Sequence, residues 1–182
     1  MFEGIKHKIG LRKMRKEFIN LRRNGKVINL EQAQSVAIIY RVEDEKKLTV
    51  VKNYVKHLKE EEGVRKIMTL GYFPEKEMSP FLKPQLEFDF FCKKDMQWNE
   101  RPGGTTVKNF CSEYYDILID IEREEIVPLR YILNWSKAKF KVGYYTEEHK
   151  NYYDLMMQVP KEDTAEFIAQ VNYYLSIINK VS

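Results

Sequence analysis

Two short apolar segments that flank an amphipathic stretch place the strongest limit on how this chain can fold. The first, YDILIDI at 115–121, is mostly apolar, as expected of a strand buried on both faces of a parallel sheet. The second, FKVGYY, lies at 140–145. Four apolar residues between them recur near helical spacing: Leu129, Ile132, Leu133 and Trp135. The segment 115–145 therefore predicts a strand, a helix and a second strand, which together form one βαβ unit.

The same kind of pattern recurs along the rest of the chain. Apolar runs predict further strands at 35–42, 66–73, 86–92 and 152–159. Amphipathic stretches predict a helix that opens at Glu43-Asp44-Glu45 and ends at Gly63, a short helix at 107–113 and a last helix capped by Asp163 or Thr164. Three prolines in 74–85 predict an irregular connection. Strands that alternate with helices indicate an α/β fold. We expect a three-layer sandwich with a mainly parallel, Rossmann-like sheet of about six strands, preceded by an N-terminal amphipathic helix.

Length and composition favour one folded domain with a terminal arm. The 182 residues suffice for a single substantial core, and 43% hydrophobic residues with 13% aromatic residues exclude a disordered chain. We expect a basic helical arm at 1–30 and a Rossmann-like domain at 31–182. Cys92 and Cys111 show no Cys-x-x-Cys spacing, so we expect buried free thiols and no zinc site or disulfide framework.

The arm carries most of the positive charge. Residues 1–26 contain nine Lys and Arg against two Glu, a net +7, whereas the whole chain is +4 and the remainder is therefore −3. A basic arm on a mildly acidic body predicts contact with an anionic or protein partner, such as RNA, the ribosome or another protein. The candidate partner-binding residues are Arg12, Lys13, Arg15, Lys16, Arg22 and Arg23.

The alternative is a helix that packs on its own domain and leaves a solvated basic face. The apolar residues of the arm recur at spacings of two to four: Ile5, Ile9, Leu11, Met14, Phe18 and Leu21. This periodicity does not distinguish the body, a second copy of the chain or a lipid interface as the surface that covers them. The arm also has no aromatic side chains arranged to stack on bases. Asn24-Gly25 favours a turn that ends it.

A candidate ligand cleft lies where two predicted strands end. In open parallel sheets, ligands bind beyond the carboxyl ends of the strands at the point where the strand order reverses. If strands 35–42 and 115–121 are neighbours, their ends bring together charged residues: Arg41, Glu43, Asp44, Asp120, Glu122 and Arg123. Paired carboxylates near arginines can act in acid–base chemistry or hold a divalent cation, and surface ion pairs produce the same pattern. We therefore assign no residue a catalytic or metal-binding role.

The segment Gly103-Gly104-Thr105 is a weaker candidate for anion binding. Two glycines and a hydroxyl residue before a short helix can present free N–H groups to a phosphate. The segment lacks the lysine and the spacing of a P-loop and the three glycines of the dinucleotide fingerprint. A flexible turn with Thr105 as the N-cap is the favoured interpretation.

The histidines and a group of tyrosines add no recognisable motif. His7, His57 and His149 lie in separate segments without metal-ligand spacing, and we expect them to be exposed. Tyr144, Tyr145, Tyr152 and Tyr153 flank one polar loop, where they either wall a pocket or fill the edge of the core. The sequence implies no cofactor. The chain shows no signal-peptide pattern and no apolar run near the ~20 residues that span a bilayer, so we expect a cytoplasmic protein.

Several of these segments resemble a known family. The strings YDILIDI, SKAKFKVGYY and YYDLMM resemble a family of small uncharacterised bacterial proteins with a basic N-terminal helix and an α/β domain. That family has a domain of unknown function, so the resemblance implies a fold and no catalytic residues. The DILID strand and AKFKVG at 138–143 are also similar to the acceptor-side half of heptosyltransferase-type (GT-B) glycosyltransferases. The chain has no room for the nucleotide-sugar half of such an enzyme.

Two hypotheses follow from the sequence. The first is a non-enzymatic cytoplasmic binding or adaptor protein whose basic N-terminal helix contacts an anionic or protein partner. The second is an enzyme or ligand-binding domain that takes a nucleotide or sugar phosphate at the strand-end cleft. The sequence does not indicate an oligomeric state.

Overall fold

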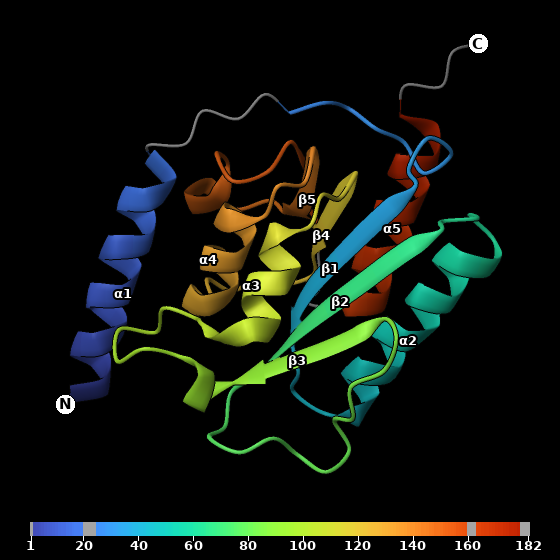
Figure 1. Ribbon diagram of the computed structural model, residues 1–182. Helices are drawn as coiled ribbons and strands as arrows, with labels where there is room; N and C mark the ends of the chain where they lie inside the picture. Colours follow the sequence, from blue (N-terminus) through green and yellow to red (C-terminus); the bar gives the residue numbers. More distant parts are fainter. Residues whose placement is uncertain (1, 20–24, 160–162, 179–182) are drawn as a thin grey trace.

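The computed structural model describes residues 2–19, 25–159 and 163–178 (Figure 1). The helices are α1 (Phe2–Ile19), α2 (Glu45–Glu60), α3 (Gly104–Ser112), α4 (Val127–Trp135) and α5 (Thr164–Ile177). The strands are β1 (Ser35–Arg41), β2 (Lys66–Phe73), β3 (Phe88–Cys92), β4 (Ile117–Asp120), β5 (Phe140–Tyr144) and β6 (Leu155–Met157). Short 3-10 helices, η1 (Lys93–Asp95) and η2 (Glu147–His149), follow β3 and β5.

All six strands form one parallel sheet in the order β3-β2-β1-β4-β5-β6. This is the strand order of Rossmann folds, and the direction of winding reverses between β1 and β4. These two central strands pair with Val36 opposite Ile117 and Ile39 opposite Asp120. The structure confirms the expected α/β sandwich and the expected adjacency of the 35–42 and 115–121 strands.

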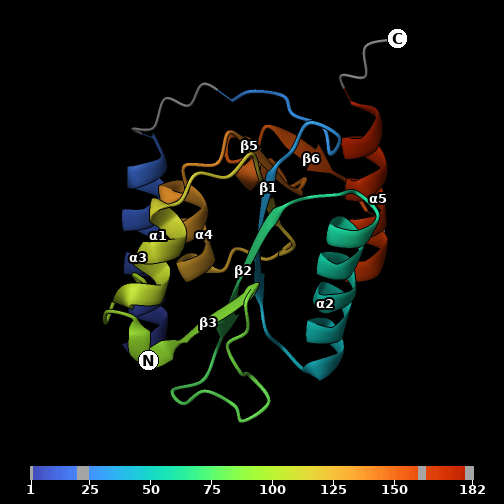
Figure 2. The same cartoon turned by 45° about the vertical axis from the view of Figure 1, so that its right-hand side comes forward.

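The two faces of the sheet are covered by different helices (Figure 2). α2 and α5 cover one face, where Leu48, Val51 and Phe167 pack against β1 and its neighbours. Asp44 caps α2 by accepting a hydrogen bond from the Lys47 N–H at 2.8 Å, and Gly63, at a φ of 69°, turns the chain after the helix. The local signals read from the sequence at both ends of α2 are therefore present in the structure.

α3 and α4 cover the other face, and α1 packs on the outside of α4. Met14 is fully buried against Val127 and Tyr131. Gly10 is also buried, and a Cβ atom there would lie 2.6 Å from the Asn99 carbonyl oxygen. Only glycine permits this close approach of helix and loop. The arm is thus a docked helix within the described part of the chain.

One apolar residue of α1, Ile5, lies away from the surface that packs on α4. Leu11 and Met14 contact the cluster formed with α4, whereas Ile5 is 52% exposed. Two further residues of the expected apolar face, Phe18 and Leu21, have side chains outside the described residues. The outward face of α1 consequently combines exposed cations with an exposed isoleucine.

Several details differ from the sequence-based expectation. Strand β6 is limited to Leu155–Met157, because residues 151–154 before it form a turn and a bend. The β2–β3 connection is irregular, as the prolines in 74–85 predicted. Thr105 is not the N-cap of α3: the helix begins at Gly104 and Gly103 occupies the cap position. Within the described ranges, no helix is long and apolar enough to cross a bilayer.

Candidate functional site

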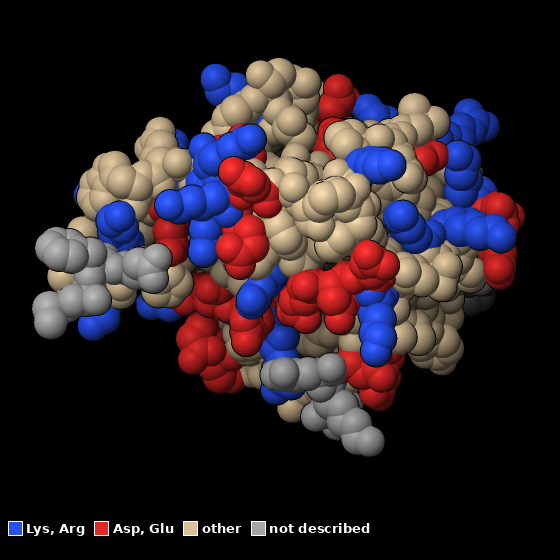
Figure 3. Space-filling view, turned by 90° about the horizontal axis from the view of Figure 1, so that it is seen from below, with Lys and Arg blue, Asp and Glu red and all other residues tan. Residues whose placement is uncertain are grey.

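The edge of the sheet at which the strands end carries a dense group of charges. Figure 3 views the molecule from this side and shows Asp and Glu side chains gathered near the middle of the face, with Lys and Arg side chains among them. This edge includes the ends of β1 and β4, where the sheet topology favours ligand binding. The residues there divide into an upper group around Glu122, whose side chains range from 5% to 52% exposed, and a fully buried group around Asp120.

Glu122 is the central member of the upper group. Its side chain is 5% exposed, and its Oε1 atom accepts hydrogen bonds from the Arg41 backbone N–H at 2.8 Å and from Lys47 Nζ at 2.7 Å. Lys47 Nζ also lies 3.3 Å from Glu43. Burial raises the pKa of Glu122 to about 7, although Lys47 opposes this shift. A carboxyl group that titrates near neutral pH is chemically suited to accept or donate a proton.

The buried group consists of Asp120, Arg130 and Tyr153, which lie beneath the surface. Asp120 accepts a hydrogen bond from the Tyr153 hydroxyl at 2.9 Å and pairs with Arg130, and both charged side chains are fully buried. Arg130 also donates to the Tyr153 hydroxyl oxygen at 2.6 Å and to the Glu124 carbonyl oxygen at 2.7 Å. Burial disfavours the charged guanidinium, but Asp120 and the other carboxylates outweigh it and raise the pKa of Arg130. The group therefore ties β4, α4 and the following loops together as a neutral pair.

The six residues predicted for the ligand cleft have different positions in the structure. Arg41, Glu43 and Glu122 meet around Lys47, and the Arg41 guanidinium lies 3.4 Å from Glu124. Asp44 is occupied as the cap of α2, and Asp120 is covered by Arg130 and Tyr153. Glu43, Glu122 and Arg123 do line a common cavity, but its volume is about 120 Å³. Pockets for drug-sized ligands occupy roughly 300–1,000 Å³, so this cavity accommodates only a few waters or a small ion.

The predicted anion-binding segment lies at the start of α3. Gly103 donates its N–H to the Asp95 carbonyl oxygen at 2.8 Å, and Gly104 adopts a φ of 82°. Gly104 and Thr105 are exposed, and no side chain caps the helix. The backbone arrangement thus leaves the first N–H groups of α3 without a side-chain acceptor. Phosphate binding by Gly103, Gly104 and Thr105 stays a prediction.

The basic face of α1 is only partly neutralised by the body. Arg15 donates to both carboxylate oxygens of Glu125, at 2.6 and 3.3 Å. Other cations of this helix are exposed and, within the described residues, have no ion-pair partner: Lys6, Lys8, Arg12, Lys13 and Lys16. Arg22 and Arg23 lie outside the described residues. The helix therefore presents a rigid group of cations to the surroundings.

One aromatic side chain accompanies these cations. Lys13 Nζ lies 5.5 Å from the centre of the Trp98 ring, and Trp98 is 60% exposed. Trp98, Lys6 and His7 help to line a cavity of about 520 Å³ at the ends of β2 and β3. The sequence showed no aromatic platform beside the arm, because Trp98 reaches α1 only through the tertiary fold.

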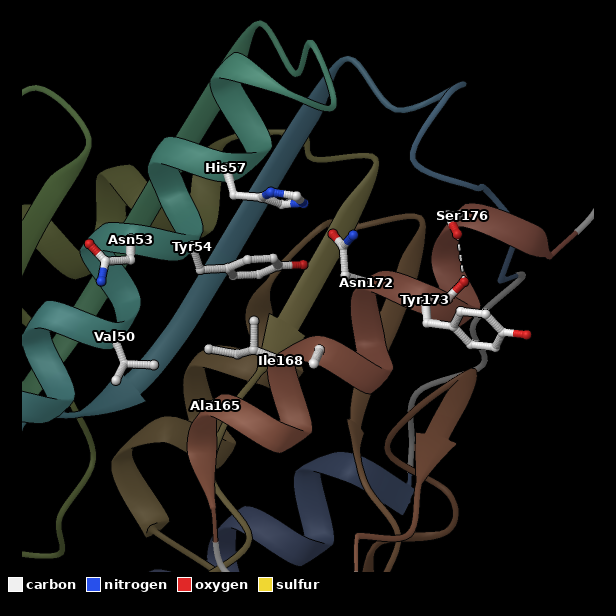
Figure 4. Close-up of a pocket in the computed structure, with 10 residues that line it drawn as sticks. Val50, Asn53, Tyr54, His57, Ala165, Ile168, Asn172, Tyr173 and Ser176 are labelled. Atoms are coloured by element: carbon white, nitrogen blue, oxygen red, sulfur yellow. Dashed lines mark hydrogen bonds between the residues drawn. The ribbon is translucent and has the colours of Figure 1, made fainter.

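A larger cavity, of about 620 Å³, lies between α2 and α5 on the opposite face of the sheet. Figure 4 shows Tyr54 and His57 from α2 pointing toward Asn172 of α5, with Val50, Ala165 and Ile168 along the apolar part of the groove. His57 and the Asn172 amide both reach Glu62, at 3.2 and 2.9 Å. This groove is remote from the residues predicted from the sequence.

His149 is the clearest residue that the sequence analysis misjudged. It is 3% exposed, its ring stacks on Tyr152 with the centroids 5.2 Å apart, and its Nδ1 atom is buried without a partner. Burial and the nearby Arg130 charge lower the pKa of His149 to about 4. The imidazole is therefore neutral at pH 7, and the expectation of an exposed His149 is wrong because the loop folds back against α4.

Other residues of the edge were missed for a related reason. Lys47, Arg130 and Tyr153 belong to predicted elements, but their contacts join segments far apart in the sequence. Arg130 did carry a signal, since it is the one charged residue in the apolar helix VPLRYILNW and a buried charge requires a partner. Among the described residues, no group of three or more His, Cys, Asp or Glu lies close enough to hold a metal ion.

Of the resemblances seen in the sequence, the comparisons with known proteins support the one to a family of unknown function. Neither the curated proteins nor the solved structures include a match to this chain. A family profile does match, and it covers residues 6–178, which include most of α1 together with the whole sheet. The chain therefore belongs to DUF6913, a family of unknown function.

Proposed function

We propose that this protein is a non-enzymatic cytoplasmic binding or adaptor protein that engages RNA, free or within the ribosome, through the outward face of α1. The observation that carries the proposal is a helix whose Gly10 side packs on the body and whose other side carries cations that have no ion-pair partner among the described residues. Gly10 and Met14 fix the helix against the body, while Lys8, Arg12 and Lys16 follow one another at helical spacing on the exposed side.

Electrostatics supports an anionic partner. Exposed cations that are not neutralised by the body produce a local positive potential, which attracts a polyanion and makes its binding dependent on salt. Arg15 contributes less, because Glu125 already holds its guanidinium in a two-point hydrogen bond. The favoured binding surface consequently runs along Lys8, Arg12 and Lys16 and continues through Lys13 toward Trp98.

The strand-end cleft is occupied by its own ion pairs, and this supports a binding role over catalysis. Its carboxylates are already satisfied by Lys47, Arg41 and Arg130, and its cavity measures about 120 Å³. Substrate would have to displace these ion pairs before it could reach the carboxylates. α1, in contrast, needs no rearrangement to present its cations.

The test is charge reversal at three positions of α1, with Lys8, Arg12 and Lys16 all changed to Glu. Deletion of the helix is unsuitable because it would expose the apolar surface of Val127 and Tyr131. We expect the wild type to bind a labelled single-stranded RNA in a salt-dependent manner. The triple variant should bind this RNA at least about tenfold more weakly at low salt, with a smaller salt dependence. The measurements are fluorescence anisotropy and RNA recovery from native lysate at low and high salt.

The matched control reverses three lysines on α2, Lys46, Lys52 and Lys56. These residues are exposed, and α2 covers the opposite face of the sheet. The control changes the net charge by the same amount, so equal losses in both triple variants would indicate a general charge effect and contradict the proposal. Recovery of a protein in place of RNA, lost in the α1 variant alone, would reassign the partner as a protein.

The second candidate function is a ligand-binding or enzymatic domain for a nucleotide or sugar phosphate, with glycosyltransferase-like half-domain character. The observation that favours it is the pKa of Glu122, which burial brings to about 7 beside the switch point of the sheet. Isothermal titration with a sugar phosphate tests it. This candidate function requires saturable binding that is altered in Glu122→Gln. Injection heats identical to the heat of dilution would contradict it.

A further inference from the structure

A cavity lies at the strand-end edge between the N-terminal half of α1 and the segment after β3. Its volume is about 520 Å³, within the range of pockets for small ligands. Three separate parts of the chain form it: α1, the end of β2, and the η1 region with the residues that follow. The lining residues are Gly4, Lys6, His7, Tyr72, Lys93, Met96, Gln97, Trp98 and Glu100.

The walls of this cavity are held in place by specific contacts. His7 Nδ1 lies 2.9 Å from a carboxylate oxygen of Glu100, and the Asn99 carbonyl oxygen fits against Gly10. The loop is closed by the Gln97 N–H, which donates to the Arg101 carbonyl oxygen at 2.9 Å. Glu100 adopts a φ of 62°, a left-handed conformation that is unfavourable for a residue with a side chain. The loop therefore keeps a defined shape against α1.

The chemistry of the lining combines positive charge with an exposed aromatic ring. Lys6 and Lys93 are exposed and, in the described part of the chain, neither forms an ion pair. Glu100 also lines the cavity and lies 2.9 Å from His7, so the two lysines and this one carboxylate leave a net positive charge in the lining. Lys13 lies over Trp98 at 5.5 Å, yet Trp98 stays 60% exposed and contributes to the cavity wall. Gln97 adds an amide, which can both donate and accept hydrogen bonds.

We infer that this cavity binds a nucleoside phosphate, with the base against Trp98 and the phosphate between Lys6 and Lys93. Any of the bases can stack on an exposed indole, because every base has a flat aromatic face. Two lysines provide the point charges that a phosphate requires. Tyr72 also lines this cavity, and burial raises its pKa to about 12, so its hydroxyl remains protonated.

Two sources can supply this chemistry, namely a free mononucleotide or one nucleotide of a single-stranded RNA. The second source rests on the proposed function, because the cations of α1 would guide the strand toward the cavity. The first source is independent of it. The experiment must therefore contain both ligands and must separate the cavity from the outward face of α1.

The test titrates AMP, inorganic phosphate and a short oligo(A) RNA into wild-type protein and the variants Trp98→Ala and Lys93→Ala. Binding is followed by calorimetry and, in the wild type, by quenching of tryptophan fluorescence. We expect Trp98→Ala to weaken binding by at least about fivefold and Lys93→Ala by about threefold or more, consistent with a lost stacking contact and a lost phosphate contact. Inorganic phosphate alone should bind more weakly than AMP and compete with it.

Two surface residues provide matched controls. Tyr114 is 69% exposed with Lys137 Nζ 4.8 Å from its ring centre, a pairing like that of Trp98 and Lys13 but away from the lining residues. Lys94 is exposed and adjacent to Lys93, and it does not line the cavity. Tyr114→Ala and Lys94→Ala should bind both ligands as the wild type does. Because all four side chains are exposed, unfolding midpoints should remain close to that of the wild type.

The outcomes distinguish the inference from the proposed function. Saturable AMP binding that is weakened in Trp98→Ala and Lys93→Ala supports the inference for a free nucleotide. If the two variants weaken binding of oligo(A) alone, the inference is supported for a nucleotide of single-stranded RNA. Binding of both ligands that is unchanged in these variants, or absent throughout, overturns it. If AMP still binds but RNA binding is unchanged in the α1 triple variant, the inference about the cavity stands and only the proposed function is rejected.

Discussion

The strand-end edge of this protein has two halves that both carry charged residues. The charges pair with one another in one half and, among the described residues, lack such partners in the other. At the β1–β4 switch point, Glu122, Lys47, Asp120 and Arg130 satisfy one another, and the remaining cavity has about 120 Å³. At the ends of β2 and β3, Lys6 and Lys93 have no such partners among the described residues, and the cavity has about 520 Å³. Charged residues near a favoured position of the fold thus indicate a ligand site only where the fold leaves them unpaired.

The difference arises from the depth at which the charges lie. Charges that are removed from water must be paired, because an isolated buried ion is very costly. Arg130 and Asp120 are fully buried and therefore lock the segments that carry them. Lys6 and Lys93 remain hydrated and lose little by lacking a partner. The switch-point half is expected to govern stability, and the α1 half is expected to govern binding.

Loss of the Arg130 charge should produce the largest effect on stability. Arg130→Met leaves Asp120 as an uncompensated buried charge, and we expect the free energy of unfolding to fall by about 3–5 kcal/mol. Urea denaturation followed by circular dichroism measures this change. The double variant Asp120→Leu with Arg130→Met should recover part of the loss. A decrease below about 1 kcal/mol in the single variant would show that the pair does not lock this half of the edge.

Two titratable groups in the switch-point half should change stability with pH in opposite directions. The pKa of Glu122 rises from 4.5 to about 7 on folding, so the folded state binds the extra proton and stability falls as the pH rises through this interval. The pKa of His149 falls from 6.5 to about 4, so the unfolded state binds the extra proton and stability rises as the pH rises from 4 to 6.5. Each shift corresponds to about 3 kcal/mol, and the two largely cancel in the wild type.

Single substitutions separate these contributions. Relative to the wild type, Glu122→Gln should gain stability with rising pH between 4.5 and 7, and His149→Phe should lose stability with rising pH between 4 and 6.5. The free energy of unfolding measured at a series of pH values tests both. Difference profiles that are flat across these intervals would mean that neither group changes its pKa on folding.

Substitution of Gly10 tests the contact that joins α1 to the open half. Gly10→Ala places a Cβ atom 2.6 Å from the Asn99 carbonyl oxygen and 3.3 Å from Val127 Cγ1. We expect a loss of about 1–3 kcal/mol in stability, because helix and loop must move apart. Gly4→Ala is the control, since nothing lies within 4 Å of a Cβ atom there. Thermal unfolding of both variants measures the difference, and equal midpoints would show that the helix adjusts without cost.

The smallest effect is expected for the ion pair between α1 and the loop after β4. Arg15 pairs with Glu125 at 2.6 Å, but its side chain is 50% exposed. Arg15→Gln should therefore change stability by less than about 1 kcal/mol, far less than Arg130→Met. Urea denaturation at low and high salt provides the comparison. An effect as large as that of Arg130 would remove the proposed distinction between buried and exposed pairs.

Local sequence patterns were sufficient for most of the architecture. The apolar run at 115–121, the helical spacing of Leu129 to Trp135 and the second apolar run correspond to β4, α4 and β5. Hydrophobic periodicity reports which side of an element is buried, and this is a property of neighbouring residues in one segment. Element boundaries were less accurate: β6 is shorter than expected, and Gly103 replaces Thr105 as the cap of α3.

The sequence predicted much less about the candidate sites than about the fold. The sequence placed Arg41, Glu43 and Glu122 at one edge by the rule for parallel sheets, and the structure does bring them together around Lys47. It did not reveal that Tyr153 and Arg130 cover Asp120, since these contacts depend on how β6 and α4 approach β4. Similarly, the burial of His149 depends on the path of the loop after β5.

The sequence by itself determined the fold class, the parallel order of strand and helix, and the excess of positive charge in the first helix. The tertiary structure decided which of those charges are paired, because pairing depends on distances between residues far apart in the chain. It placed Trp98 beside Lys13 and Glu125 beside Arg15, two contacts with opposite consequences for the basic helix. One contact adds an aromatic surface to the exposed cations, and the other neutralises a cation, so the packing of α1 on α4 defines the surface available to a partner.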